Sequence, residues 1–92
     1  MNKLIDIQEI IDFIKLNLPK DLHSIDNLKA EFGNWESKAY YRFVSSENAN
    51  IPGSEWQFHD NLVIEHQKYG TIILDILKNN RIGGIEFYKF LK

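Results

Sequence analysis

Cysteine is absent from this sequence, which excludes a disulfide framework, a thiolate metal site and a cysteine nucleophile together. No apolar run approaches the roughly 20 residues of a membrane-spanning helix. The N-terminus, MNKLIDIQEI, is periodic and carries acids, whereas a secretory leader has a basic segment followed by an apolar one. We therefore expect a cytoplasmic protein without a membrane partner.

Excess positive charge is also lacking. The net charge of the 92 residues is −2, which disfavours direct binding of nucleic acid through a basic patch. Residues 4–36 hold seven acids against three lysines, a local charge of −4, and residues 78–92 hold four basic residues against one acid, a local charge of +3. The chain thus predicts a mostly acidic surface with a basic C-terminal end.

Patterns typical of catalysis are missing as well. The serines and the threonine lie in no nucleophile-elbow or triad motif. Gly83-Gly84 is followed by neither a lysine nor a helix, as a phosphate-binding loop requires. We expect a protein that is not an enzyme, with no catalytic or cofactor-binding residues and no cofactor.

A metal site is not expected either. In a strand, His59 and Asp60 point to opposite faces, as do Glu65 and His66, so neither pair can chelate one ion. The two histidines meet only if residues 60–61 form a turn, and two ligands alone make a weak site.

What is present is enough apolar sequence for one core. Apolar residues make up 43% of the chain and charged residues 26%, as in an ordinary globular domain, and the length predicts a single domain over residues 1–92. Isoleucines at helical spacing predict a helix over 5–18 that Pro19 ends. Asp6 is the expected N-cap, and Glu9 completes a capping-box pair.

A second, short helix is predicted over residues 25–32, with Ser24 as its N-cap and Gly33 as its C′ residue. From Lys38 onward the apolar period falls to two, which predicts an α+β fold: one or two N-terminal helices packed on an antiparallel meander of four to five strands. The expected segments are strands at 39–44, 55–59 and 62–66, a loop at 45–54, a turn or bulge at 60–61, a turn at 67–70 and a hairpin over 71–88.

The hairpin, TIILDILKNNRIGGIEFY, has a definite expected register. A two-residue loop at Asn79-Asn80, in a type I′ turn, pairs residues whose numbers sum to 159. Asp75 then faces Gly84, and Ile76 faces Gly83. The glycines relieve crowding or permit a bulge beside the turn. The residues expected on the core face are Ile72, Leu74, Ile76, Ile85 and Phe87.

Three acids are expected to share the opposite face of the sheet: Glu65, Asp75 and Glu86. This follows if the loop before the hairpin has an odd number of residues, with positive φ at Gly70, and then Leu62, Ile64 and His66 join the core side. Two interpretations remain open. The acids keep an open sheet face hydrated and deter edge-to-edge pairing, or they form an acidic docking surface with the apolar residues between them.

Aromatic residues add a second possible contact region. Trp35 is expected in a loop, either exposed as an interface anchor or packed in the core. Trp56 and Phe58, two residues apart in a strand, are expected in the core. The aromatic run at 40–43 is similar to the stacking platforms of RNA-binding proteins but has no interleaved basic residue other than Arg42, which favours packing.

Four motifs resemble small bacterial immunity proteins of contact-dependent growth-inhibition and related polymorphic toxin systems. They are GSEWQF (53–58), NLVIE (61–65), GTIILDIL (70–77) and RIGGIEF (81–87), which together cover roughly the C-terminal 40% of the chain. The resemblance implies a cytoplasmic antitoxin that binds a cognate toxin domain, often a nuclease, and occludes its active site.

The leading hypothesis is therefore a toxin-neutralising protein that is monomeric or homodimeric when free. The alternative is a small structural or regulatory subunit that self-associates through its sheet. The residues expected to bind the partner are Glu65, Asp75, Glu86, Trp35, Asp60 and Glu55.

Overall fold

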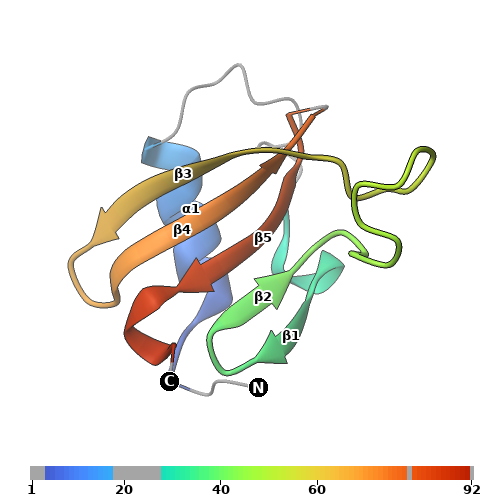
Figure 1. Ribbon diagram of the computed structural model, residues 1–92. Coiled ribbons are helices and arrows are strands. Elements are labelled where there is room, and N and C mark those ends of the chain that lie inside the picture. The colour runs from blue at the N-terminus through green and yellow to red at the C-terminus, as the bar shows by residue number, and fades with distance from the viewer. Residues whose placement is uncertain (1–3, 18–27, 79, 92) are drawn as a thin grey trace.

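One helix packs on a five-stranded antiparallel sheet (Figure 1). The computed structural model describes residues 4–17, 28–78 and 80–91. The order of the strands across the sheet is β1-β2-β5-β4-β3, and the predicted α+β class is confirmed. The elements are α1 (Ile7–Asn17), β1 (Asn34–Ser37), β2 (Tyr40–Arg42), β3 (Phe58–His66), β4 (Gly70–Leu77) and β5 (Ile82–Phe87), with short 3-10 helices at Ala30–Phe32 and Tyr88–Phe90.

Helix α1 begins where the sequence predicts. The N–H groups of Gln8 and Glu9 donate to Asp6 Oδ1 at 3.0 and 3.3 Å, so Asp6 is the N-cap. The reciprocal bond of a capping box is replaced by a bridge, because the Asp6 N–H donates to the Tyr69 hydroxyl at 3.4 Å and that hydroxyl donates to Glu9 at 3.5 Å. The predicted stop at Pro19 lies outside the described residues.

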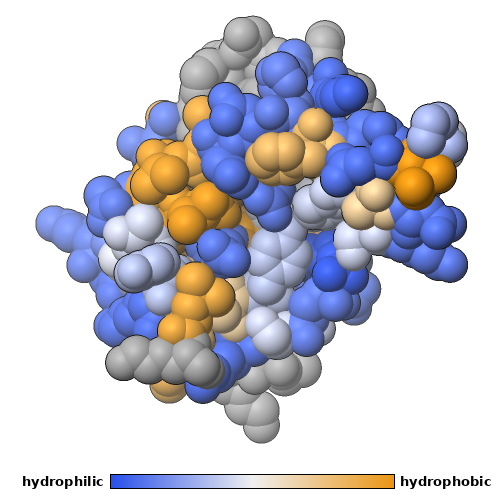
Figure 2. Space-filling view, viewed as in Figure 1, coloured by the Kyte–Doolittle hydropathy of each residue, from blue (hydrophilic) through white to orange (hydrophobic). Residues whose placement is uncertain are grey.

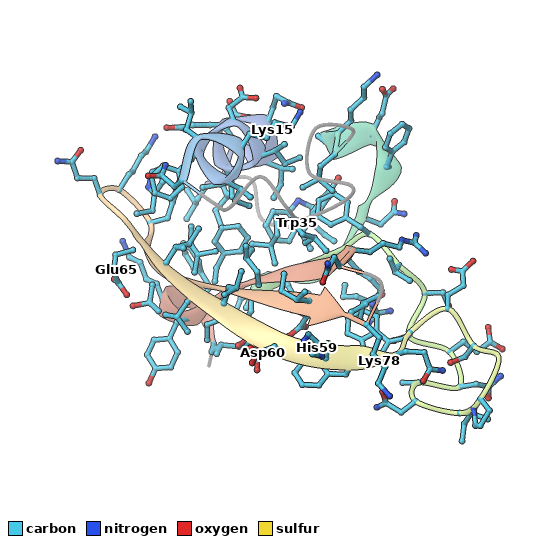
Figure 3. All side chains as sticks on the ribbon, turned by 90° about the horizontal axis from the view of Figure 1, so that it is seen from above. Lys15, Trp35, His59, Asp60, Glu65 and Lys78 are labelled. Atoms are coloured by element: carbon cyan, nitrogen blue, oxygen red, sulfur yellow. The ribbon has the colours of Figure 1, made fainter. Side chains whose placement is uncertain are left out.

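The helix covers one face of the sheet, which we call the inner face. Isoleucine side chains of α1 are buried against that face, and Trp35 lies between the helix and the sheet (Figure 3). The expected core residues of the hairpin are all buried there, and Leu62 and Ile64 pack against them. The buried isoleucines of the helix are Ile7, Ile10, Ile11 and Ile14.

Over the described residues 28–32, the second predicted helix is wrong except for a short 3-10 turn. Ser24 and residues 25–27 lie outside the described residues, Lys29 is extended, and only the 3-10 turn at Ala30–Phe32 is helical. Gly33 is extended (φ −130°) rather than left-handed. A Cβ on Gly33 would lie 2.5 Å from Tyr41 Cε2, and the Tyr41 hydroxyl donates to the carbonyls of Ala30 and Gly33. Close approach to this tyrosine, not a helix cap, explains the glycine.

Strand β1 was expected to be a loop. It pairs with β2, with Trp35 opposite Tyr41, and the pairing is irregular between Trp35 and Ser37. Four residues with one apolar side chain among polar ones carry too little periodicity to predict a strand. The strand predicted over 39–44 is confirmed as the shorter β2.

Strand β3 is one continuous strand of nine residues, so the break expected at 60–61 is not a turn. The pairing with β4 shifts instead between Phe58 and Asp60, which places the irregularity at His59. At the other end the prediction is confirmed: His66 faces Gly70 across a three-residue loop, and Gly70 has φ +76°.

Facing residues of β4 and β5 have numbers that sum to 159, as predicted, from the pair Ile72 and Phe87 to the pair Asp75 and Gly84. Near the turn it differs, because Ile76 faces Ile82 instead of Gly83. The Leu77 N–H donates to the Arg81 carbonyl at 2.9 Å, so three residues separate the bonded ends of the two strands and the predicted two-residue turn is wrong. Asn80, at φ +61°, supplies the left-handed residue of a three-residue hairpin loop. Gly83 is the extra residue, so the alternative of a bulge is confirmed.

Candidate functional site: the outer face of the sheet

The face of the sheet turned away from α1 is the candidate site, and we call it the outer face. Registers place all three predicted acids on it, one each from β3, β4 and β5. Figure 2 looks onto this face and shows a hydrophobic area over β3 and β4 bordered by hydrophilic surface. Its central side chains are those of Tyr40, Arg42, Asn61, Val63, Glu65, Thr71, Ile73, Asp75 and Glu86.

Asp75 is the polar centre of the outer face. The Tyr40 hydroxyl donates to Asp75 Oδ2 at 2.6 Å, and Asn61 Nδ2 donates to Asp75 Oδ1 at 2.6 Å. Tyr40 belongs to β2, so its ring reaches Asp75 on β4 across the intervening strand β5. We call this connection from β2 to β3 the Tyr40–Asp75–Asn61 brace.

Gly84 makes the brace possible. It faces both Asp75 and Arg42 in the registers, and a Cβ there would lie 2.8 Å from Tyr40 Cε2 and nearer still to the hydroxyl. Real Cβ atoms do not approach that closely. The ring therefore occupies the space that a side chain at position 84 would fill. Its hydroxyl can reach the next strand for this reason.

Burial and like charge alter the acid–base properties of this region. Burial, followed by the hydrogen bond to Asp75, raises the pKa of Tyr40 far above its ordinary value. Burial, followed by the negative charge of Asp75, raises the pKa of Glu86 above its ordinary value of 4.5. A charged Glu86 is thus disfavoured by its own surroundings.

Glu65 is the most accessible of the three acids. It faces Thr71, whose hydroxyl lies 3.0 and 2.8 Å from its two carboxylate oxygens, and its side chain is exposed. Val63 beside it is 61% exposed, and Tyr88, directly after β5, is 62% exposed. This end of the outer face joins an exposed carboxylate to accessible apolar surface, a composition suited to protein contacts.

A cation, Arg42 on β2, lies at the other end of the outer face from Glu65. Arg42 forms an ion pair with Glu36 at 2.9 Å, and its guanidinium carbon lies 5.8 Å from the centre of the Tyr40 ring. Nε of Arg42 is buried and has no hydrogen-bond partner among the described residues. Because Glu36 offsets its charge, Arg42 does not change the acidic character of the β3–β4 end.

Trp35 is not exposed in a loop. Its ring packs edge-on against Tyr41 at 5.1 Å and lies 5.7 Å from Phe87 between the centres, and it is half-buried on the inner face (Figure 3). The alternative of core packing is confirmed.

The other tryptophan closes the turn end of the outer face. Trp56 is buried over Gly83, where a Cβ would lie 2.7 Å from Trp56 Cζ3, and it forms a small second cluster with Val44 and Leu77. Phe58, expected in the core, is 37% exposed, because the irregularity at His59 interrupts the alternation of β3.

The remaining predicted contacts lie near the loop after β2. Asp60 is exposed, and its carboxylate accepts the N–H of Asn61 at 2.8 Å. Glu55 is exposed in the loop, where it lines a shallow depression with Glu47. Figure 3 shows Asp60 toward the middle of β3 and Glu65 near its far end.

The histidines do not come together. His59 and His66 lie seven residues apart on the continuous strand β3. His66 Nδ1 accepts the N–H groups of Lys68 and Tyr69, and its ring packs against Phe13. Among the described residues, no three histidine or carboxylate side chains cluster in a way that could hold a metal ion.

Within the described ranges, no helix is long and apolar enough to cross a membrane. Comparisons with protein-family models, curated proteins and solved structures found no match for this chain.

Proposed function

We propose that the protein is an immunity protein that binds a cognate toxin domain in the cytoplasm and covers its active site. The observation that carries the proposal is the accessible mixture of acid and apolar surface at the β3–β4 end of the outer face. There the exposed carboxylate of Glu65 lies beside Val63, on a face that no described helix covers. Such a function is stoichiometric and needs no catalytic group.

The expected partner is a nuclease, because a nuclease must hold phosphates and is commonly basic around its active site. An acidic binding surface speeds association with such a partner through electrostatic steering and opposes entry of the nucleic acid. Asp60 and Glu55, both exposed, extend the negative charge from β3 toward the preceding loop.

The hydrogen bonds distinguish Glu65 from Asp75. Both carboxylate oxygens of Asp75 accept hydrogen bonds from within the protein, so we assign Asp75 to the charge of the surface and not to a direct contact. Glu65 accepts from a single exposed hydroxyl group, which leaves lone pairs for a basic partner. Trp35, on the inner face, is left out of the proposed contact.

Co-expression tests the proposal directly. The toxin domain encoded immediately upstream of this gene should kill cells when expressed alone and should be harmless when this protein is co-expressed. The two proteins should also co-purify. Absence of an encoded toxin domain, or continued killing despite soluble expression of this protein, would overturn the proposal.

Charge reversal tests the surface. Glu65→Lys should lower the association rate with the toxin domain by roughly 2- to 10-fold and flatten its dependence on salt. The matched control is Asp12→Lys, because Asp12 is also an exposed acid and lies on α1, behind the sheet. Equal effects of both variants, measured by stopped-flow binding, would place the contact elsewhere.

A further inference from the structure

Strand β3 forms one edge of the sheet and is its longest strand, with nine residues. The other edge, β1, has four residues and an irregular register. Long regular edges present unpaired backbone groups that another strand can bind, and proteins usually shorten or interrupt them. Strand β3 is irregular only near Phe58 and Asp60, so residues 61–66 keep a regular register that can serve as a template.

Two observations show which backbone groups of β3 point away from the sheet. The Leu77 N–H points to β5, where it donates to Arg81. Because backbone N–H and C=O groups alternate in direction along a strand, those of Leu74 and Ile72 point to β3. Independently, the Asn61 N–H donates to the side chain of Asp60 at 2.8 Å, as expected of a group that points away from β4. Leu62 and Ile64 therefore pair with β4, and Asn61, Val63 and Glu65 direct their carbonyls and remaining N–H groups outward.

We propose that this edge binds β3 of a second copy of the chain, antiparallel, about a two-fold axis at Val63. In this register, facing residues of the two copies have numbers that sum to 126. Val63 faces Val63 of the second copy, which joins two side chains that are each 61% exposed. Asn61 faces Glu65. Of the two hydrogen bonds that the Asn61 amide donates, the one to Asp75 is short (2.6 Å) and the one to the Leu74 carbonyl is long (3.4 Å), so the second can be exchanged for the facing carboxylate. On the inner face Leu62 meets Ile64, both half-buried.

Neighbouring registers fit less well. A two-fold axis at Glu65 would place the two Glu65 carboxylates opposite each other, which is destabilising. An axis at Asn61 would bring the irregular segment at His59 into the ladder. The intermediate registers set Val63 against Glu65, or Asp60 against Ile64, and so pair an apolar side chain with a charged one. Only the axis at Val63 matches apolar with apolar and amide with carboxylate throughout.

The expected dimer is weak. A pairing of about five residues buries less than the roughly 1,200 Å² of a standard stable interface, so self-association is expected only at high protein concentration. The two-fold axis is perpendicular to the sheet. The two copies therefore form one continuous sheet, and their outer faces lie on the same side of it. The inference does not depend on the proposed function, since it concerns the free protein.

Single cysteines test the register without background, because the chain has no cysteine of its own. Facing residues of a hydrogen-bonded antiparallel pair have Cα atoms about 5.5 Å apart, within the range of a disulfide. Val63→Cys should therefore form a disulfide-linked dimer at least roughly tenfold faster than Glu65→Cys, whose copies would lie roughly 13 Å apart. Equal rates for the two variants under the same oxidant would overturn the register.

A proline tests the pairing itself. The Val63 N–H points away from β4, so Val63→Pro leaves the ladder inside the sheet intact but removes the central donor of the dimer. Val63→Thr, which keeps that donor, is the control. Sedimentation equilibrium over two decades of concentration should show self-association for the native chain and Val63→Thr, and a monomer for folded Val63→Pro. A native chain that stays monomeric throughout, or a Val63→Pro chain that still dimerises, would contradict the proposal.

Discussion

The carboxylate of Asp75 accepts one hydrogen bond from Tyr40 and one from Asn61, each at 2.6 Å. A half-buried carboxylate without such donors would destabilise the fold, whereas hydrogen bonds to a charged group each contribute about 1.5–3 kcal/mol. The acid in the middle of an otherwise apolar strand is therefore explained by the brace. Glu86 lacks comparable donors among the described hydrogen bonds, and burial, followed by the charge of Asp75, raises its pKa.

Replacement of Tyr40 by phenylalanine should lower the free energy of unfolding by about 1.5–3 kcal/mol at pH 7, because one hydrogen bond to the carboxylate is lost. Urea denaturation measures the change. Tyr88→Phe is the control, since the Tyr88 side chain is 62% exposed, and its effect should stay within about 0.5 kcal/mol.

The effect of Tyr40 should also depend on pH. Its folded pKa is raised above the ordinary value of 10.0, so the fold favours the protonated hydroxyl. The advantage of tyrosine over phenylalanine is then fully present below pH 10 and declines as the pH rises above it. An advantage that grows in alkaline solution would contradict the brace.

Glu86→Gln should stabilise the protein at neutral pH. The folded pKa of Glu86 is raised by burial and by Asp75, so ionisation of this group works against folding above its ordinary pKa of 4.5. The gain in melting temperature should disappear as the pH falls below that value, where the native carboxyl is also neutral. Melting curves of both proteins from acidic to neutral pH provide the measurement.

Among the elements, α1 and the β4–β5 hairpin could be predicted from sequence because their signals are local. The helix has a capped start at Asp6 and isoleucines on one side, and the hairpin alternates strictly from Ile72 to Asp75. The loop length could not be predicted, because a two-residue and a three-residue loop leave the same alternation once a bulge at Gly83 absorbs the difference.

The glycines of β5 illustrate what local reasoning misses. The partner predicted for Gly84, Asp75, is confirmed, and the partner predicted for Gly83, Ile76, is wrong. The residues that need the space are Trp56 over Gly83 and Tyr40 over Gly84. The tyrosine comes from β2, and adjacency of β2 and β5 is a property of the topology. A glycine facing an acid, with a tyrosine on another strand, is the signal that could have suggested the brace.

Gly84→Ala should displace the Tyr40 ring and destabilise the protein by about 1–3 kcal/mol, the usual cost of overpacking. A double-mutant cycle identifies the cause. If the ring is what fills the space, Gly84→Ala should cost little once Tyr40→Ala has emptied it. Additive effects of the two substitutions would mean that the glycine is needed for another reason.

At the scale of the whole molecule, the sheet combines strands that are close in sequence with strands that are far apart in sequence. Strands β3, β4 and β5 follow one another through short loops, whereas β2 meets β5 with Tyr40 opposite Glu86. The shared face of Glu65, Asp75 and Glu86 was predictable because it lies within the strands that are close in sequence. The brace and the inner position of Trp35 were not, because both depend on how the β1–β2 hairpin joins β5.

The crossing of Tyr40 over Gly84 has a consequence for the order of folding. Closing short loops costs less entropy than joining distant segments, so the β3–β4–β5 meander should form early and the β1–β2 hairpin should dock late. The hydrogen bond from Tyr40 to Asp75 then forms late and holds the docked hairpin in place. Tyr40→Phe should speed unfolding about tenfold or more while changing refolding little, whereas Ile72→Val, inside the meander, should mainly slow refolding. Stopped-flow chevron plots would distinguish the effects of the two variants. Slower refolding of Tyr40→Phe would mean that the Tyr40 hydrogen bond already forms in the folding nucleus.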